Sequence, residues 1–524
     1  MFHSRVYREQ RTSGDGLAMP ALEVDASIEA FRGGDVQKAI ETARKVCEAY
    51  PDHVDGWMML GVYLKEAKRW QEAEACLMQS MRLEPSNPSV HNNLGNLLKL
   101  LGRLDEAENR YRRACRLAPE ELDYQLNLGR HLMIQGKEDE GLGLLQEASR
   151  QHNQRWECKH ALGIAYLQFF ALEKAEACFR QVLELNPANA EAYANLGSSL
   201  VCQNRHHEAK QVLEQAIGIN PFLPQPYWNL SIIFLREGNY ENGWGFHEWR
   251  RKLPGYLERV DPLKEWNGRD LKDRTLLLRA EQGLGDTLQF IRYLPLAKKR
   301  VGKLILECQA ELVDLLADFS GVDEIVERDG QCIVYDEALP LLSLPWVLGL
   351  KNEFREEAVP YLGCYNKKNI AGKFRVGLAW SGSKQHAQDS LRSCQLGELE
   401  ELRAIEDIEW VCLQKDGAQE LESMNWPMEV SSLDNFQITR SVLENLDLLI
   451  TVDTSVAHLA GAIGMPVWNL IQYSPDWRWG MNADKTCWYP GMRLFRQKVF
   501  RDWSQTIHEV ASSLKNEIQQ RVRE

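Results

Sequence analysis

Small residues recur every 34 positions through the first half of the sequence. They stand at Ala39, Ala73, Ala107, Gly141, Ala175, Ala209 and Gly243. Twelve residues before most of them there is a glycine, at Gly61, Gly95, Gly129, Gly163 and Gly197, and Ser27 and Ser231 hold that place in the first and last units. Prolines keep the same period, at Pro51, Pro85, Pro119, Pro187 and Pro221, with Asn153 where another would stand. Three series in phase predict seven copies of one supersecondary unit.

A 34-residue period with these landmarks resembles the tetratricopeptide repeat. Each copy is then expected to be two antiparallel helices. The small residues allow the paired helices to approach closely, and the proline ends the second helix. Leucines beside the glycines, such as Leu60 and Leu94, supply an apolar face that one copy cannot bury alone. We therefore predict a helical superhelix with a concave surface over residues 21–250, after a flexible N-terminus at 1–20.

The repeats also carry a recurring amide. Asn93, Asn127, Asn195 and Asn229 stand at one repeat position, before a Leu-Gly or Leu-Ser step. Amides in a row can pair with the N–H and C=O groups of an extended peptide, and this row resembles the asparagine ladder of protein O-GlcNAc transferases. Alternatively, Asn-Leu-Gly is simply common in such repeats. The first interpretation predicts that these four residues bind a peptide or protein acceptor.

The composition argues against several classes of protein. The net charge is -13 without any long basic block, so the electrostatic signature of nucleic-acid binding is missing. No uninterrupted apolar run of about 18 residues exists, which argues against a membrane span. The N-terminal segment lacks the apolar stretch of a signal peptide, and the twelve cysteines contain no C-x-x-C pair. We therefore expect reduced thiols in a cytoplasmic protein.

From residue 275 the pattern changes to short apolar runs that alternate with helical segments. The first set of runs is TLLLRA, KLILEC, EIVER and QCIVYD, and the second is RVGLAW, EWVCLQK, LDLLITV and PVWNLI. Such alternation predicts parallel sheets built from βαβ units. We expect a linker at 251–273 and two Rossmann-like halves at 274–365 and 372–524, with a cleft between them. Ligands of such sheets bind at the carboxyl ends of the strands, so the loops after these runs are the candidate sites.

The first such loop is AEQGLGD, residues 280–286, which follows TLLLRA. Gly283 and Gly285 are expected to permit positive φ and to let a ligand approach the backbone. Spacing alone leaves two interpretations of Asp286. As an N-cap, it would bond free N–H groups of the helix that begins there. As a general base facing the cleft, it would take the proton of an attacking hydroxyl, an effect typically worth about 10²–10⁴-fold in rate.

A second loop follows the run LLITV. Asp453 ends this run, and a helix is expected to begin near Thr454 and Ser455. The free N–H groups and positive end of that helix suit an anion such as a nucleotide diphosphate, with the two hydroxyls as further donors and His458 one turn along. Alternatively, Thr454 or Ser455 only caps the helix, and His458 is a buried side chain with a hydrogen-bond partner.

The remaining loops give weaker signals. Lys384, His386 and Arg392 follow RVGLAW, and Gln414 and Lys415 follow EWVCLQK, so these side chains either hold phosphates or are solvated. The segment SPDWRWGMNADKTCWYPG either stacks a base or sugar or packs where the two halves meet, and packing is favoured. Its aromatic residues are Trp477, Trp479, Trp488 and Tyr489. No residues have the spacing of a zinc site or of a Walker loop.

Together these segments resemble the bacterial ADP-heptose:lipopolysaccharide heptosyltransferases, and more closely bacterial proteins in which tetratricopeptide repeats precede such a domain. The matching pieces are EQGLGDTLQFIRYLP, GLAWSGSKQH, VDTSVAHLAGAIG and the PDWRW segment, within residues 261–505. The resemblance implies a GT-B domain pair and an inverting, metal-independent glycosyltransferase with no cofactor and a nucleotide-diphosphate sugar as donor. It also implies that Asp286 is the catalytic base.

The resemblance further implies that the donor's diphosphate lies near Lys384, Thr454, Ser455 and His458. Gly283, Gly285, Gln414, Lys415 and Asp453 complete the candidate nucleotide-sugar site. No residue identifies the donor's base or sugar. We expect transfer of a hexosyl or heptosyl group to an acceptor, most plausibly a protein, that the repeats recruit. The alternatives are a non-catalytic scaffold with a degenerate transferase domain, and a transferase whose acceptor is a glycan such as lipopolysaccharide.

Overall fold

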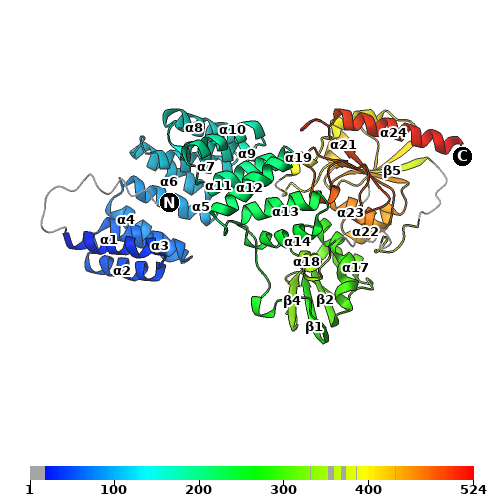
Figure 1. Cartoon of the computed structure of the whole chain (residues 1–524). Helices are drawn as coiled ribbons and strands as arrows, with labels where there is room; N and C mark the ends of the chain where they lie inside the picture. The colour runs from blue at the N-terminus through cyan, green and yellow to red at the C-terminus, as the bar shows by residue number, and fades with distance from the viewer. Residues whose placement is uncertain are drawn as a thin grey trace. The chain divides into compact units, whose positions relative to one another are not determined.

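The computed structural model of the chain describes residues 18–330, 332–351, 359–366, 373–384, 386, 388–430 and 432–523. Contacts between residues divide the chain into two compact units, Met1–Ser199 and Leu200–Glu524. The described residues of the first unit form helices and their connecting turns, and the second unit contains three further helices of the same kind followed by two parallel sheets (Figure 1).

Fourteen α-helices follow one another in seven antiparallel pairs in the described part of the chain before the first sheet. They are α1 (Ala18–Arg32), α2 (Val36–Ala49), α3 (Val54–Glu66), α4 (Trp70–Leu83), α5 (Pro88–Leu100), α6 (Leu104–Leu117), α7 (Leu122–Ile134), α8 (Glu138–Gln151), α9 (Trp156–Gln168), α10 (Leu172–Leu185), α11 (Ala190–Cys202), α12 (His206–Ile219), α13 (Pro224–Arg236) and α14 (Tyr240–His247). The predicted helical repeat is therefore confirmed. The repeating prolines lie in the turns after α2, α4, α6, α10 and α12, where they were expected to end the second helix of a pair.

The recurring glycines lie where the two helices of a pair touch. A Cβ atom on Gly61 would come within 2.7 Å of Leu77, one on Gly95 within 2.7 Å of Tyr111, and one on Gly163 within 2.7 Å of Phe179. These large partners are buried on the second helix of the same pair. The period of small residues therefore reflects close helix packing, as predicted, and not backbone conformation.

Replacing Gly95 by alanine should destabilise the first unit. The new Cβ would overlap the ring of Tyr111, which is fully buried and whose hydroxyl donates to Asn96 Oδ1 at 2.8 Å. Overpacking of this kind costs about 1–3 kcal/mol, more than the gain of roughly 1 kcal/mol from alanine's helix propensity. The matched control is Gly143 of α8, which is exposed with nothing within 4 Å of its Cβ position. Gly143→Ala should raise the melting temperature where Gly95→Ala lowers it, and equal effects would contradict the packing account.

The second unit contains a four-stranded sheet with the order β3-β2-β1-β4. Its strands are β1 (Leu271–Arg279), β2 (Val301–Cys308), β3 (Glu324–Glu327) and β4 (Glu337–Pro340), and all their pairings are parallel. The helices α15 (Leu284–Phe290), α16 (Leu294–Lys298), α17 (Ala310–Leu316) and α18 (Leu344–Val347) connect or follow these strands. A short 3₁₀-helix, η1 (Glu248–Lys252), joins α14 to the segment that leads into β1.

A six-stranded parallel sheet follows, with the order β10-β9-β8-β5-β6-β7. Its strands are β5 (Phe374–Ala379), β6 (Ile408–Cys412), β7 (Glu429–Val430), β8 (Leu448–Val452), β9 (Val467–Ile471) and β10 (Met492–Arg496). Counted along the chain from β5, this is the 3-2-1-4-5-6 order of doubly wound nucleotide-binding sheets, and the first sheet has the 3-2-1-4 part of it. The predicted parallel sheets are therefore confirmed.

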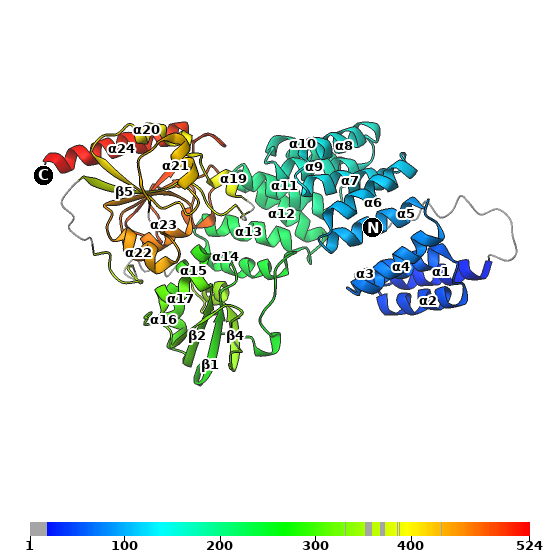
Figure 2. The same ribbon diagram turned by 180° about the vertical axis from the view of Figure 1, so that it is seen from behind.

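Helices cover both faces of the six-stranded sheet (Figures 1 and 2). The helices α20 (Glu400–Arg403), α21 (Ala418–Met424) and α24 (Ser504–Arg523) lie on one face, and α22 (Phe436–Leu443) and α23 (Ser455–Ala462) lie on the other. The central strand β8 supplies both faces: Leu448 and Ile450 belong to the core beneath α24, and Leu449 belongs to the core beneath α23. That core continues beneath the first sheet, so both sheets share buried apolar side chains.

One predicted strand is wrong. The run QCIVYD was expected to form a strand, but residues 332–336 are irregular and the strand of this region begins at Glu337. The run is apolar because Ile333 and Tyr335 pack beside the buried side chains of the first sheet, while Val334 is exposed. The short strands β4, β7 and β10 were not predicted.

Candidate active site

The candidate loops lie at the carboxyl ends of the two parallel sheets. In each sheet the strand order switches sides at the strand that comes first in the chain. Strands β2 and β3 lie on one side of β1 and β4 lies on the other, and in the same way β6 and β7 lie on one side of β5 and β8 lies on the other. Ligands of doubly wound sheets bind outside the carboxyl ends of the strands at such a point. The loop that carries Asp286 follows β1, the loop that carries Lys384 follows β5, and the loop that carries Thr454 follows β8. The structure therefore puts these three predicted loops at the edges where ligand binding is expected.

The loop after β1 differs in detail from the prediction. Helix α15 begins at Leu284 and its N-cap is Gly283, so Asp286 is the third helical residue and not the N-cap. Its Oδ2 accepts from the Gly283 N–H at 2.9 Å, so the side chain of the third helical residue binds back to the N–H of the N-cap residue. The expected positive φ is wrong as well, because Gly283 has φ -73° and Gly285 lies within the helix.

The position of Gly285 has no room for a larger residue, because another helix lies against it. A Cβ atom there would be 2.8 Å from His458 Cδ2 and 3.5 Å from Ser455 Cα, both on α23. The first turn of α15 from one sheet therefore touches the first turn of α23 from the other. The structure brings Asp286, Ser455 and His458 into one neighbourhood although about 170 residues of sequence separate them.

Arg478 is the partner of Asp286 that sequence reasoning missed. Its Nη2 donates to Asp286 Oδ1, its Nη1 donates to Asp476 Oδ1 at 2.8 Å, and its Nε donates to Gln289. The side chain is only 9% exposed and lies in the 3₁₀-helix η7 (Trp477–Trp479). The sequence does contain one indication of this ion pair, which is an arginine between the two tryptophans of PDWRW. If these aromatic residues are buried, the guanidinium is buried with them and requires a carboxylate partner.

The start of α23 combines free donors with a buried histidine. Thr454 is the N-cap, as expected, but its hydroxyl makes no capping bond and lies 3.1 Å from the Thr451 hydroxyl. His458 Nδ1 lies 2.8 Å from the Tyr489 hydroxyl, and its ring stacks on Trp479 at 5.4 Å. Burial, and then the charge of Arg478, hold the pKa of His458 well below its usual value, so it is neutral. These contacts are those of a buried side chain with a partner.

Asp453 connects the end of β8 to this neighbourhood. One carboxylate oxygen lies 3.9 Å from His458 Nε2. Burial, and then the negative charge of Asp476, raise the pKa of Asp453 to about 6. The carboxyl group is therefore poised to gain a proton in mildly acidic solution, which a carboxylate in water would not do.

The loop after β5 contributes side chains of two kinds. Lys384 and Lys415 are exposed and have no hydrogen bond or ion pair with any described residue. Gln414 accepts from the Ser381 N–H at 3.0 Å, so it holds the loop in place. Arg392 is largely buried and its Nε lies 3.2 Å from Asp389 Oδ1. Besides the larger effect of burial, the positive charge of Arg392 acts to lower the pKa values of both Asp453 and His458 at the start of α23.

A buried ion-pair network fixes the turn before α15. Arg250 of η1 is 2% exposed and donates to Glu281 Oε1 at 2.6 Å, to Glu248 at 2.7 Å and to the Ser343 hydroxyl at 2.8 Å. The hydroxyl of Tyr256 donates to the other oxygen of Glu281. The turn AEQGLGD is therefore held by the segment that follows the last helix pair. Sequence reasoning placed Glu281 in this turn but did not assign it a partner.

The aromatic residues of the PDWRW region are packed in the interior, which was the favoured interpretation. All four are at most 3% exposed: Trp477, Trp479, Trp488 and Tyr489. Trp477 meets Trp244 of α14 edge to face at 5.3 Å, and Phe290 of α15 lies at the same cluster. They join the last helix pair to both sheets and leave no ring face for a base.

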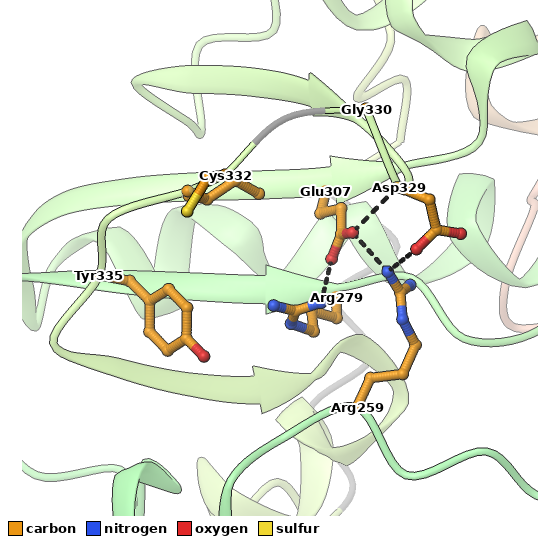
Figure 3. Close-up of a pocket in the computed structure, with 8 residues that line it drawn as sticks. Arg259, Arg279, Glu307, Asp329, Gly330, Cys332 and Tyr335 are labelled. Carbon is orange, nitrogen blue, oxygen red and sulfur yellow. Dashed lines mark hydrogen bonds and ion pairs between the residues drawn. The ribbon is translucent and has the colours of Figure 1, made fainter.

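A separate open pocket of about 650 Å³ lies at the carboxyl ends of β1, β2 and β3 (Figure 3). Glu307 is 3% exposed and binds Arg259 at 2.6 Å and Arg279 at 2.9 Å, and Arg259 also binds Asp329 at 2.6 Å. Tyr335 lines the opposite side. The two arginines are matched by two carboxylates, so the pocket is close to charge balance.

The recurring asparagines mostly contact their own neighbours. The Nδ2 of Asn127 donates to Asn92 Oδ1 of the preceding repeat at 2.9 Å, and Asn195 Nδ2 lies 3.2 Å from His160 Nε2 of the preceding repeat. Asn229 is buried and its Oδ1 accepts from Gln225 at 3.5 Å. Asn93 is half-buried. Asn127 and Asn195 thus link consecutive repeats and retain an acceptor oxygen each.

Sequence models of the tetratricopeptide repeat match residues 24–88, 88–121, 157–189 and 178–211. Protein FlbA of Caulobacter vibrioides is 23% identical over 382 residues, which cover 64% of this chain and 63% of FlbA. The peroxisomal targeting signal receptor of Kluyveromyces lactis is 24% identical over 211 residues, which cover 40% of this chain and 37% of the receptor. The chain therefore spans less than two thirds of the length of either relative.

Solved structures with similar helices have low overall similarity. YrrB, described as a TPR protein with an unusual peptide-binding site, is 22% identical, covers 36% of this chain and 96% of its own, and has a TM-score of 0.28. Yeast Tom70 is 19% identical, covers 45% of this chain and 50% of its own, and has a TM-score of 0.38. In the described part of the chain no helix is both long enough and apolar enough to span a membrane. Its N-terminal part carries tetratricopeptide repeats, which are able to bind partner proteins.

Proposed function

We propose that the chain is a partner-binding repeat protein whose sheets form a GT-B glycosyltransferase. The donor is a nucleotide-diphosphate sugar, and the acceptor is a hydroxyl on a protein that the repeats recruit. The observation that carries this proposal is the contact between α15 and α23, each of which begins at the carboxyl edge of a doubly wound sheet. Two loops that ligands use in such sheets thereby serve one site.

The donor's diphosphate is assigned to the start of α23. The N–H groups of its first turn and its positive end favour an anion, and the hydroxyls of Thr454 and Ser455 add donors. Arg392 supplies a largely buried positive charge in the same neighbourhood, and Lys384 an exposed one on the same loop. Fixed donors stabilise the charge that develops on the leaving diphosphate.

The acceptor's proton is assigned to Asp286. In the proposed step the carboxylate takes the proton of the acceptor hydroxyl, whose oxygen forms a bond to the anomeric carbon. The bond between that carbon and the diphosphate oxygen breaks, and the nucleoside diphosphate leaves with the electron pair, so the anomeric configuration inverts. Arg478 donates to one oxygen of Asp286 and the Gly283 N–H donates to the other, and together these two bonds orient the carboxylate.

A non-catalytic scaffold is the second candidate, and the same contacts favour it. Both oxygens of Asp286 already have donors, and Gly285 touches His458 directly. A domain that has lost its substrates would keep such internal contacts. The two candidates differ in one property, which is the binding of a nucleoside diphosphate.

Calorimetry of the full chain with ADP, GDP, UDP, CDP and TDP separates these candidates. We expect one of the five to bind, and we expect Ser455→Glu to weaken that binding about tenfold or more, because a carboxylate at the helix start repels the diphosphate. Ser512→Glu introduces the same charge at an exposed position of α24 and should leave binding unchanged. Binding of none of the five would leave the scaffold, and intact-mass analysis of proteins co-purified from the native host would then report only partners without added sugar.

A further inference from the structure

Two cations on the first helices of consecutive repeats lack partners. Lys99 lies near the end of α5 and Arg130 lies in α7, and both side chains are half-buried. Neither has a hydrogen bond or ion pair with any residue that the structure describes. Other cations of the same unit bind glutamates closely, for example Arg69 at 2.7 Å, Arg103 at 2.7 Å and Arg112 at 2.8 Å. Exposed cations such as Lys45 and Arg116 also lack a counter-ion, but water solvates them, whereas Lys99 and Arg130 are half-buried.

The two charges also repel each other. Burial, followed by the charges of Arg130 and Lys65, lowers the pKa of Lys99. Burial lowers the pKa of Arg130 too, although Asp123 and Glu191 oppose this from positions outside ion-pair distance. Half-buried like charges without counter-ions reduce the stability of the fold. A ligand that brings negative charge to this place would relieve that cost.

Amide side chains share helix faces with the two cations. Asn92, Asn96 and Lys99 follow the helical spacing that puts them on one face of α5, and Asn127 and Arg130 share a face of α7. The two faces are joined, because Asn127 Nδ2 donates to Asn92 Oδ1 at 2.9 Å. The Oδ1 of Asn127 and the amino group of Asn92 have no partner among the described residues, so they are able to pair with a peptide backbone. We call these five residues the α5–α7 face.

We propose that the α5–α7 face binds an extended peptide segment that carries aspartate or glutamate side chains. Lys99 and Arg130 bind the carboxylates, and the amides of Asn92 and Asn127 pair with the peptide backbone between them. This rests on the proposed recruitment of a protein acceptor and specifies the chemistry of the segment that is recruited. Because the whole chain carries a net charge of -13, long-range attraction does not assist an acidic ligand, and recognition depends on these local charges.

Fluorescence anisotropy with the full chain tests the proposal. The probes are two labelled Ser/Gly-rich peptides of equal length, one with evenly spaced glutamates and the other with glutamines in their places. We expect the glutamate peptide to bind more tightly and its affinity to fall with added NaCl. Lys99→Gln combined with Arg130→Gln should weaken its binding about tenfold or more, because charged hydrogen bonds to two carboxylates are lost.

The control pair is Lys45→Gln with Arg116→Gln, which makes the same charge change at exposed positions of α2 and α6. It should leave the affinity for the glutamate peptide unchanged. The Lys99/Arg130 variant should also melt at the same or a higher temperature than the parent, because it removes an unfavourable repulsion and not a contact. Equal affinity for the two peptides, or equal losses in the two variants, would overturn the proposal.

A phosphoserine peptide or a single-stranded RNA that binds this face while the glutamate peptide does not would overturn it as well. The outcome is independent of the transferase proposal, which nucleoside diphosphate binding to the second unit tests. If nucleotides bind and the glutamate peptide does not, the acceptor reaches the enzyme by another surface. If the peptide binds and no nucleotide does, the α5–α7 face belongs to a scaffold.

Discussion

Replacing Asp286 by asparagine is expected to lower sugar transfer by roughly 10²–10⁴-fold while leaving nucleoside diphosphate binding nearly intact. Asparagine has the same shape, and its Oδ1 is able to accept from the Gly283 N–H that Asp286 binds at 2.9 Å. The start of α15 should therefore keep its conformation. What is lost is the negative charge that would receive the acceptor's proton, together with the bond from Arg478 Nη2, because an amide NH2 cannot accept a hydrogen bond.

The measurement is the release of nucleoside diphosphate from the donor that calorimetry identifies, in the presence of proteins from the native host. Asp476→Asn is the matched control, because Asp476 and Asp286 both form ion pairs with Arg478. The Oδ1 of Asp476 lies 2.8 Å from Arg478 Nη1. That change removes a charge from the same guanidinium without touching the proposed base. Full turnover by the Asp286→Asn enzyme would exclude Asp286 as the base, and equal losses in both variants would assign the effect to Arg478.

Replacing Arg250 by methionine is expected to destabilise the second unit by about 3–5 kcal/mol. Arg250 is 2% exposed and its guanidinium serves Glu281, Glu248 and Ser343. Its loss leaves the carboxylate of Glu281, which is 7% exposed, without its buried counter-charge. Because Glu281 begins the turn that leads to α15, local opening should appear first around residues 280–290.

Chemical denaturation followed by the tryptophans of the second unit measures the loss, and hydrogen exchange locates it. Arg403→Met is the control: Arg403 is half-buried, binds the exposed Glu400 at 3.2 Å and donates to the Asn425 carbonyl at 3.1 Å, and a change of about 0–1 kcal/mol is expected for this partly solvated pair. Combining Arg250→Met with Glu281→Gln should restore part of the stability, since the unpaired buried charge is then removed. A loss no greater than that of Arg403→Met would contradict a structural role for the network.

The candidate site was partly predictable. The starts of α15 and α23 follow from apolar runs that end in Gly-Asp or Asp-Thr, and these local patterns place Asp286 and Thr454 at helix starts. The roles predicted for individual residues at the start of α15 were less accurate. Gly283, and not Asp286, is the N-cap, and Gly285 packs against His458. Local spacing predicts that a helix begins, but it does not identify the side chain that packs against it.

Arg478, Arg250 and Lys99 illustrate what the sequence could not predict. Arg478 lies 192 residues from the aspartate it binds, and Arg250 lies 31 residues from Glu281. No periodicity connects such positions, and an isolated arginine in a sequence is usually a solvated charge. The missing counter-ion of Lys99 is equally invisible in the sequence, because it is a property of what surrounds the side chain.

The order of residues was sufficient for the seven helix pairs, for the parallel sheets and for the loops in which a site would lie. Those features depend on the 34-residue period, on short apolar runs and on glycine and proline at defined places, which can all be read from the sequence itself. Only the folded molecule decided that α15 meets α23, that Arg478 binds Asp286 and that the aromatic loop is interior. These outcomes depend on which distant surfaces bury each other, and buried charges acquire their partners only when those surfaces come together.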